Sequence, residues 1–137
     1  MTRRAEARAP TLAERQAALV AALVGGADVP VGFDPRLVQA TRSALLRKRA
    51  GDVASAWPRT AAAYGEGWTA AFTAWAAARP PNGSLRDGWD FARSAGESLP
   101  PLAREELADR EARLTYDGQS HPRPKRLAAL RARLTCH

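Results

Sequence analysis

The chain has 137 residues, of which 45% are hydrophobic and 26% charged, so it has room for one globular domain with a modest core. Its single cysteine excludes an internal disulfide framework and a cysteine metal cluster. No run approaches the roughly 18 consecutive apolar residues of a membrane span, which predicts a cytoplasmic protein with no membrane partner.

The formal net charge of +7 would suit a nucleic-acid partner, but the location of that charge weakens this interpretation. Residues 1–10 carry a charge of +2 and residues 119–137 a charge of +5, whereas residues 11–118 hold 13 basic and 13 acidic side chains. The excess therefore lies at the two ends of the chain. Nucleic acid is the alternative partner class, and the neutral body argues against it.

The first predicted helix has signals at both ends. Residues 1–10 are polar and show no periodic pattern, so we expect a disordered leader there. Thr11 and Glu14 form a capping box in front of an apolar stripe, and Gly25 begins a glycine pair that ends it. The pattern predicts a helix over residues 12–24.

A loop rich in proline and glycine separates this helix from the second one. Pro35, preceded by an aspartate that can cap, begins a helix that runs through Lys48. Gly51 is expected to end or kink it. Short helices over residues 52–57 and 58–64 should follow before two glycines break the pattern.

Residues 68–91 hold three of the four tryptophans and two of the three phenylalanines, so the core is expected here. Pro80 and Pro81 stop a first helix, and Ser84 is expected to cap a second one that Gly96 closes. The two helices should fold back on each other. The residues predicted to lie in the core are Trp68, Phe72, Trp75, Leu85 and Leu19.

The last predicted helix covers about residues 101–114 and has mixed charges. The stretch SHPRPKR then indicates a linker, and LAALRARL predicts a short basic amphipathic tail helix with its leucines on one side. No strand alternation appears anywhere. We predict an all-α fold, a single compact bundle of about five to seven helices over residues 11–118, with a basic linker and tail helix over residues 119–137.

The sequence offers no set of residues that suits catalysis. Both histidines, His121 and His137, lie in the C-terminal tail with Cys136, so a zinc or iron site with three or four converging ligands is not expected. The predicted helical body also has no histidine that could activate a serine or cysteine nucleophile. We therefore predict that the chain is not an enzyme and holds no cofactor or metal.

Binding is the remaining function, and two groups of charged residues are candidate surfaces. The predicted helix after Ser84 would bury an apolar stripe and leave a mixed face of two cations and two anions, which suits the orientation of a partner. The second predicted helix has a basic end, where the planar guanidinium groups of its arginines could form bidentate pairs with the carboxylates of a partner. Solvation of these charges is the alternative. The candidate partner-binding residues are Arg42, Arg47, Arg49, Arg86, Asp87, Trp89, Asp90 and Arg93.

Four tryptophans provide more aromatic area than a domain of this size requires. Aromatic residues that stay partly exposed are the usual anchors of protein interfaces. Trp57 and Trp89 are the candidates for such anchors, and burial in the core is the alternative for each.

Four stretches between about residues 12 and 118 carry a family resemblance: LAERQAALVAAL, RSALLRKRAGDVASAWP, YGEGWTAAFTAWAAARPPNGSLRDGWDF and LPPLAREELADREARLTYDG. The matching residues are Trp57, Pro58, Gly65, Trp68, Phe72, Arg79, Pro80, Pro81, Ser84, Leu85, Gly88, Phe91, Glu111 and Ala112. The pattern resembles the helical N-terminal domain of the partner proteins of multinuclear non-haem iron-dependent oxidases. Such partners occur in methanobactin-type systems that modify ribosomally made peptides, and some have been labelled DNA-binding domains.

The resemblance implies a non-catalytic accessory subunit that forms a heterodimer with such an oxidase, with all the iron ligands supplied by the oxidase. It also implies a role in presenting the precursor peptide. The family has a β-rich C-terminal domain that resembles peptide-recognition domains, and we expect no counterpart of it in the basic stretch after Gly118. Docking to the oxidase is therefore the part of the family function that we expect to carry over.

Overall fold

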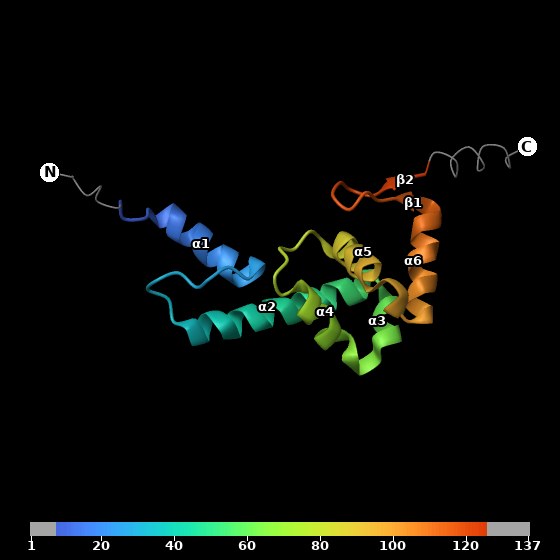
Figure 1. Ribbon diagram of the computed structural model, residues 1–137, viewed down its shortest axis with the longest axis horizontal. Helices are drawn as coiled ribbons and strands as arrows, with labels where there is room; N and C mark the ends of the chain where they lie inside the picture. The colour runs from blue at the N-terminus through green and yellow to red at the C-terminus, as the bar shows by residue number, and fades with distance from the viewer. Residues whose placement is uncertain (1–7, 126–137) are drawn as a thin grey trace, which may run out of the picture.

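The structure is a computed structural model of the chain and describes residues 8–125 (Figure 1). Within that range it confirms the all-α prediction, and no helix there is long and apolar enough to cross a membrane. The expected leader through residue 7 and the expected tail helix lie outside the described residues. The α-helices are α1 (Leu12–Gly25), α2 (Pro35–Ala56), α3 (Pro58–Tyr64), α4 (Trp68–Ala76), α5 (Ser84–Ala95) and α6 (Pro101–Arg113).

Most helix ends lie where the local chemistry predicts them. In the capping box, the backbone N–H of Thr11 donates to the Glu14 carboxylate at 2.8 Å and that of Glu14 donates to the Thr11 hydroxyl at 3.2 Å. Gly26 ends α1 with a φ of 74°, a left-handed conformation that favours glycine. The predicted cap of α5 is wrong, because Ser84 is its first residue and Gly83 precedes it without a side-chain cap.

Helix α2 runs unbroken through Gly51 to Ala56, so the predicted break and the separate helix over residues 52–57 are wrong. A glycine inside a helix costs only about 1 kcal/mol relative to alanine. Ala50 and Val53, on either side of this glycine, are fully buried in the core. Burial of a valine side chain alone contributes about 1.5–3 kcal/mol, which outweighs the propensity cost and keeps the helix continuous.

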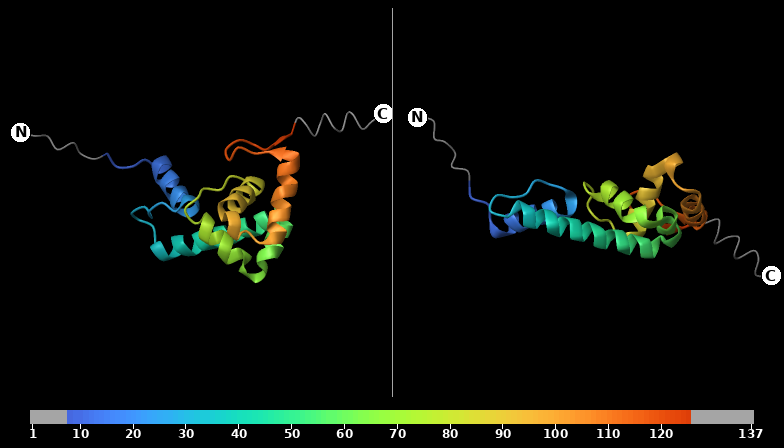
Figure 2. Two further views of the ribbon diagram at one scale, coloured as in Figure 1. Left: turned by 45° about the vertical axis from the view of Figure 1, so that its right-hand side comes forward. Right: turned by 90° about the horizontal axis from the view of Figure 1, so that it is seen from below.

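The core lies between the second half of α2 and helices α3, α4 and α5 (Figures 1 and 2). Trp68 and Phe72 are buried there as predicted, while Trp75 and Leu85 are partly buried and pack against it. Phe91 of α5 completes the aromatic cluster, with ring centroids 5.2 Å from Trp68 and 5.9 Å from Phe72. Helices α4 and α5 therefore contact each other through aromatic rings. This agrees with the prediction that the two helices fold back on each other.

Helix α6 is fixed to α3 by a buried carboxylate. Glu106 accepts hydrogen bonds from the backbone N–H groups of Arg59 at 3.1 Å and Thr60 at 2.9 Å, in the first turn of α3. A carboxylate is favourable at this position because the helix N-terminus carries partial positive charge. Arg59 of α3 also pairs with Asp109 of α6 at 2.6 Å, and Arg110 of α6 donates to the carbonyl oxygen of Ala56 at the end of α2.

A short two-stranded ribbon follows α6 where a linker was predicted. Strand β1 (Leu114–Thr115) pairs antiparallel with β2 (Arg123–Pro124). The Asp117 carboxylate shapes the turn by accepting from the backbone N–H groups of Gln119 and Ser120. The prediction that no strand occurs is therefore wrong here, because strands of two residues are too short to leave a period-two pattern.

Helix α1, the loop after it and the first half of α2 form a segment over residues 12–47, which we call the arm. It extends away from the core, as the view from below in Figure 2 makes clear. Arg42 ties it to the end of α4 by donating to the carbonyl oxygen of Ala77 at 2.8 Å. Leu19, predicted for the core, is partly buried in the arm and belongs to neither cluster of buried residues.

Candidate protein-binding site

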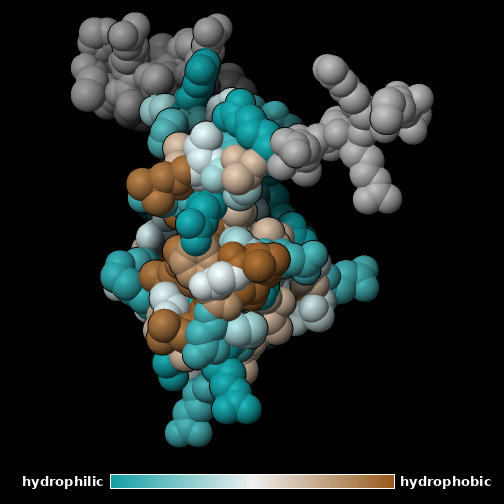
Figure 3. Space-filling model, turned by 90° about the vertical axis from the view of Figure 1, so that its left-hand side faces the viewer, coloured by the Kyte–Doolittle hydropathy of each residue, from teal (hydrophilic) through white to brown (hydrophobic). Residues whose placement is uncertain are grey.

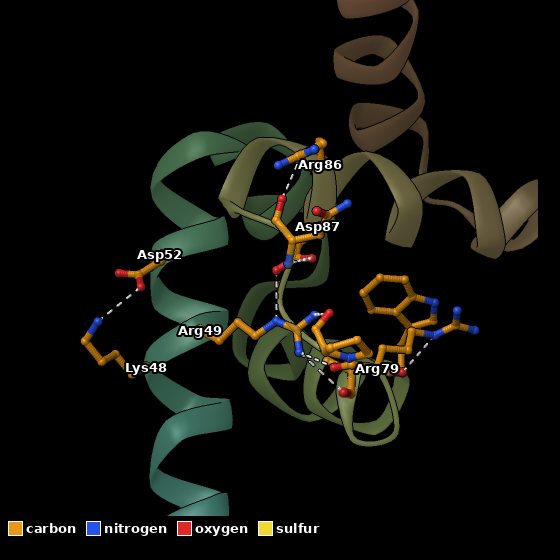
Figure 4. Close-up of polar contacts among 10 residues, drawn as sticks. Lys48, Arg49, Asp52, Arg79, Arg86 and Asp87 are labelled. Atoms are coloured by element: carbon orange, nitrogen blue, oxygen red, sulfur yellow. Dashed lines mark hydrogen bonds and ion pairs between the residues drawn. The ribbon is translucent and has the colours of Figure 1, made fainter. Parts of the chain in front are cut away.

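Arg49 and Asp87, both predicted to bind a partner, bind each other. The Nε of Arg49 donates to Oδ2 of Asp87 at 2.8 Å, and the two side chains are only 11% and 4% exposed. Figure 4 shows this pair between α2 and α5. We therefore correct the prediction for these two residues, because their charges are not open to a partner.

The same ion pair holds the loop between α4 and α5. The guanidinium of Arg49 donates to the carbonyl oxygens of Arg79 at 2.7 Å and Pro80 at 3.3 Å. The second carboxylate oxygen of Asp87 accepts from the backbone N–H of Asn82 at 3.1 Å. We call this set of contacts the clamp, since it joins α2, the loop and α5 through the buried carboxylate of Asp87 and the partly buried guanidinium of Arg49.

The other charged residues of α5 contact the ribbon and α6. Arg86 donates to the carbonyl oxygen of Gln119 at 3.2 Å, and Asp90 accepts from the Tyr116 hydroxyl at 2.9 Å. Arg93 pairs with a glutamate of α6 at 2.9 Å. The mixed face expected to meet a partner is thus largely occupied by this chain. Replacing Arg86 and Arg93 with glutamate would therefore disturb the fold as well as any docking.

Trp57 and Trp89 are core residues. Both are fully buried, and their rings form an edge-to-face pair with centroids 5.7 Å apart. The indole N–H of Trp57 donates to the carbonyl oxygen of Leu85 at 3.0 Å, and that of Trp89 donates to Glu111 at 3.0 Å. Of the two interpretations of these residues, burial is confirmed, and Trp89 leaves the set of candidate partner-binding residues.

The basic end of α2 is less open than its sequence indicates. Arg42 is bound to the end of α4 and Arg49 belongs to the clamp. The exposed guanidinium of Arg47 makes no hydrogen bond or ion pair with another described residue. Among the three predicted arginines, Arg47 alone therefore keeps a charge that a partner could contact.

Tyr116 should titrate well above the usual range of a tyrosine. Burial, followed by the hydrogen bond to Asp90, raises the pKa of Tyr116 to about 12. Since this folded-state pKa lies above the unfolded value of about 10, the linked stability is complete below pH 10 and is lost as the pH rises to 12. We expect tyrosinate absorbance in the Tyr64→Phe variant to rise near pH 12. A midpoint near pH 10 in folded protein would contradict the contact with Asp90.

A cleft of about 520 Å³ lies beside the clamp, between the α4–α5 loop, α5 and the turn of the ribbon. Within the described structure, the indole N–H of Trp75 is buried without a hydrogen-bond partner. The guanidinium of Arg79 lies 4.7 Å from the centroid of that ring.

The carboxylates of Asp87 and Asp90, which line the cleft, already accept hydrogen bonds from this chain. No group of three potential metal ligands occurs among residues 8–125.

Comparison with known proteins shows which family the chain resembles. The family model described as "SCO6045-like, C-terminal domain" matches residues 13–97. A "UPF0276 protein" of Streptomyces avermitilis is 39% identical over 102 residues, which cover 72% of this chain and 21% of that protein. The chain thus spans about a fifth of the length of this curated relative. No solved structure matches the chain.

Proposed function

The chain belongs to the family of SCO6045-like C-terminal domains, and we propose that it is a non-catalytic accessory subunit of a UPF0276-type oxidase. In this proposal the two proteins form a heterodimer. The oxidase holds the iron and supplies all of its ligands, and the chain described here supplies a binding surface. The complex modifies a ribosomally synthesised precursor peptide.

One observation carries the proposal, the similarity to part of the UPF0276 protein. About four fifths of that relative lie outside the similar segment. We take UPF0276 proteins to be oxidases of the multinuclear non-haem iron-dependent type, the same type that the sequence resemblance implies. A segment joined to an enzyme stays next to it at high effective concentration, so contacts between the two parts can form at little entropic cost. The same contacts can join separate chains.

The geometry is consistent with a scaffold that presents a fixed surface. Three of the four indole N–H groups donate within the chain, to Leu85, Ala50 and Glu111. The clamp fixes the longest loop of the core, and Glu106 fixes α6. A rigid support reduces the entropy that binding would otherwise cost.

Nucleic-acid binding, the alternative function, gains little support from the basic end of α2. Such binding relies on arginine and lysine side chains that can reach phosphate oxygens. Arg42 and Arg49 donate to groups of this chain instead, and Lys48 pairs with Asp52 at 3.4 Å. Among the described residues of this basic end, Arg47 is the one cation without a partner in the chain.

We expect co-expression of the full chain with a UPF0276-type oxidase from the same genome to yield one complex. Size exclusion with light scattering should give the mass of a 1:1 heterodimer, with a Kd below about 1 µM. An iron enzyme outside the UPF0276 family serves as the control and should elute separately. Two separate monomer peaks with the UPF0276-type oxidase would contradict the proposed function.

A further inference from the structure

Exposed apolar side chains concentrate on the arm. Seven large hydrophobic residues are exposed in the described part of the chain, and six of them lie between residues 12 and 45. Figure 3 views the molecule from the arm end, where brown apolar side chains gather among teal polar ones. Val31 is 98% exposed and Leu37 is 67% exposed. The six residues are Leu12, Val20, Val29, Val31, Leu37 and Leu45.

The arm buries little of its own apolar surface. Ala22 is the buried residue of α1, and Val38 is the buried residue of the first half of α2. Neither cluster of buried residues in the described structure includes a member of α1. A helix normally buries its apolar stripe, and exposed apolar patches on soluble proteins mark interaction sites. In α1, Leu19, Leu23 and Val24 are partly buried, whereas Leu12 and Val20 stay exposed and lack the cover that a partner would supply.

A small groove at the base of the arm can hold an apolar anchor. It has a volume of about 180 Å³, and its lining includes Leu23, Val24, Leu45, Leu46 and Pro81. Interfaces commonly place one aliphatic or aromatic side chain in such a pocket, surrounded by contacts of lower energy. The groove gives the arm a site for one side chain of a partner.

The charges around this surface favour a partner other than a second copy of the chain. Residues 11–48 hold five basic and three acidic side chains, a net charge of +2. Glu14 and Asp34 already accept the capping hydrogen bonds of α1 and α2. The guanidinium groups of Arg15 and Arg36 make no hydrogen bond with another described residue. A two-fold dimer would bring two such cationic rims together, whereas a rim of carboxylates would pair with them.

The family match includes the arm. It begins at residue 13, one residue into α1, and ends at residue 97, before α6 begins. The arm is therefore part of the domain that this chain shares with its family, while α6 and the ribbon lie outside the match. A binding surface that the whole family uses is expected within the matched residues and not on α6 or the ribbon.

From these observations we propose that the arm is the docking surface for the UPF0276-type oxidase. The inference rests on the proposed function. The oxidase would present an apolar patch with one side chain for the groove and a rim of carboxylates for the arginines. Apolar contact supplies most of the affinity, and the charged rim sets orientation and association rate.

Leu37→Asp tests the proposal, and Leu102→Asp is its matched control. Leu102 of α6 is 39% exposed and is the exposed large hydrophobic residue outside the arm among those described. Both positions lie in the first turn of a helix, where aspartate is favourable, so both variants should fold. In calorimetric titrations of the oxidase, Leu37→Asp should raise the Kd by about 30-fold or more. Leu102→Asp should change it by less than about twofold.

The outcomes separate the two proposals. If the unmodified chain does not bind the oxidase, the proposed function fails. If it binds and Leu37→Asp binds equally well while circular dichroism shows both variants folded, the docking surface lies elsewhere and this inference is overturned. If the chain alone forms a dimer that Leu37→Asp converts to a monomer, the arm binds a second copy, which also overturns it.

Discussion

Replacing Gly88 with alanine is expected to lower the free energy of unfolding by about 2–4 kcal/mol. An added Cβ at this position would lie 2.2 Å from Cδ1 and 2.4 Å from Nε1 of Trp57. The indole cannot move aside easily, because it is fully buried, donates to the Leu85 carbonyl and packs edge-to-face on Trp89. Helix α5 would have to shift away from α2. Denaturant titration followed by tryptophan fluorescence measures the loss.

Gly51→Ala is the matched control for this prediction. Gly51 also lies inside a helix, but a Cβ there would meet no atom within 4 Å. Alanine should therefore stabilise α2 by about 0.5–1 kcal/mol, as helix propensity alone predicts. A result in which both substitutions stabilise the protein would contradict the close approach of α5 to Trp57.

Asp87→Asn should have an effect of similar or larger size, about 3–5 kcal/mol of lost stability. The substitution leaves the partly buried guanidinium of Arg49 without its charged partner and weakens the hydrogen bond to the backbone of Asn82. The α4–α5 loop should then loosen. Thermal or denaturant unfolding gives the magnitude, and faster amide hydrogen exchange in the loop would localise it.

The exposed pair in Figure 4 provides a control with the same chemical change. Asp52→Asn removes the partner of Lys48, at 3.4 Å and on the surface of α2. Exposed ion pairs contribute about 0–1 kcal/mol, so this variant should lose less than about 0.5 kcal/mol. Equal losses in Asp87→Asn and Asp52→Asn would mean that the clamp contributes no more than a surface pair.

Much of the fold could be predicted from the sequence because the signals are local. The capping box, the prolines at first helical positions and the closing glycines depend on residues within one turn. They gave α1, α3 and α6 to within a residue or so. The break expected at Gly51 failed because burial of Ala50 and Val53 is a tertiary effect. The ribbon was missed because its two short strands carry no periodic pattern.

The candidate binding residues were harder to predict. Helical periodicity shows which residues share a face, but it does not show what covers that face. The charges of Arg86 and Asp90 looked open because the ribbon that contacts them was not expected. Leu19 of α1 was placed in the core because it belongs to an apolar stripe, yet it lies in the arm. An apolar stripe looks alike in sequence whether this chain or a partner covers it, and the structure leaves part of the arm's apolar surface exposed.

Docking of the arm on the oxidase is tested most directly by amide hydrogen exchange of the full chain with and without the UPF0276-type oxidase, read by mass spectrometry. If the arm binds the oxidase, peptides from residues 12–47 should exchange more slowly when the oxidase is present, and exchange in peptides from α6 should not change. Unchanged exchange along the whole chain at saturating oxidase, or protection confined to α6 and the ribbon, would contradict it.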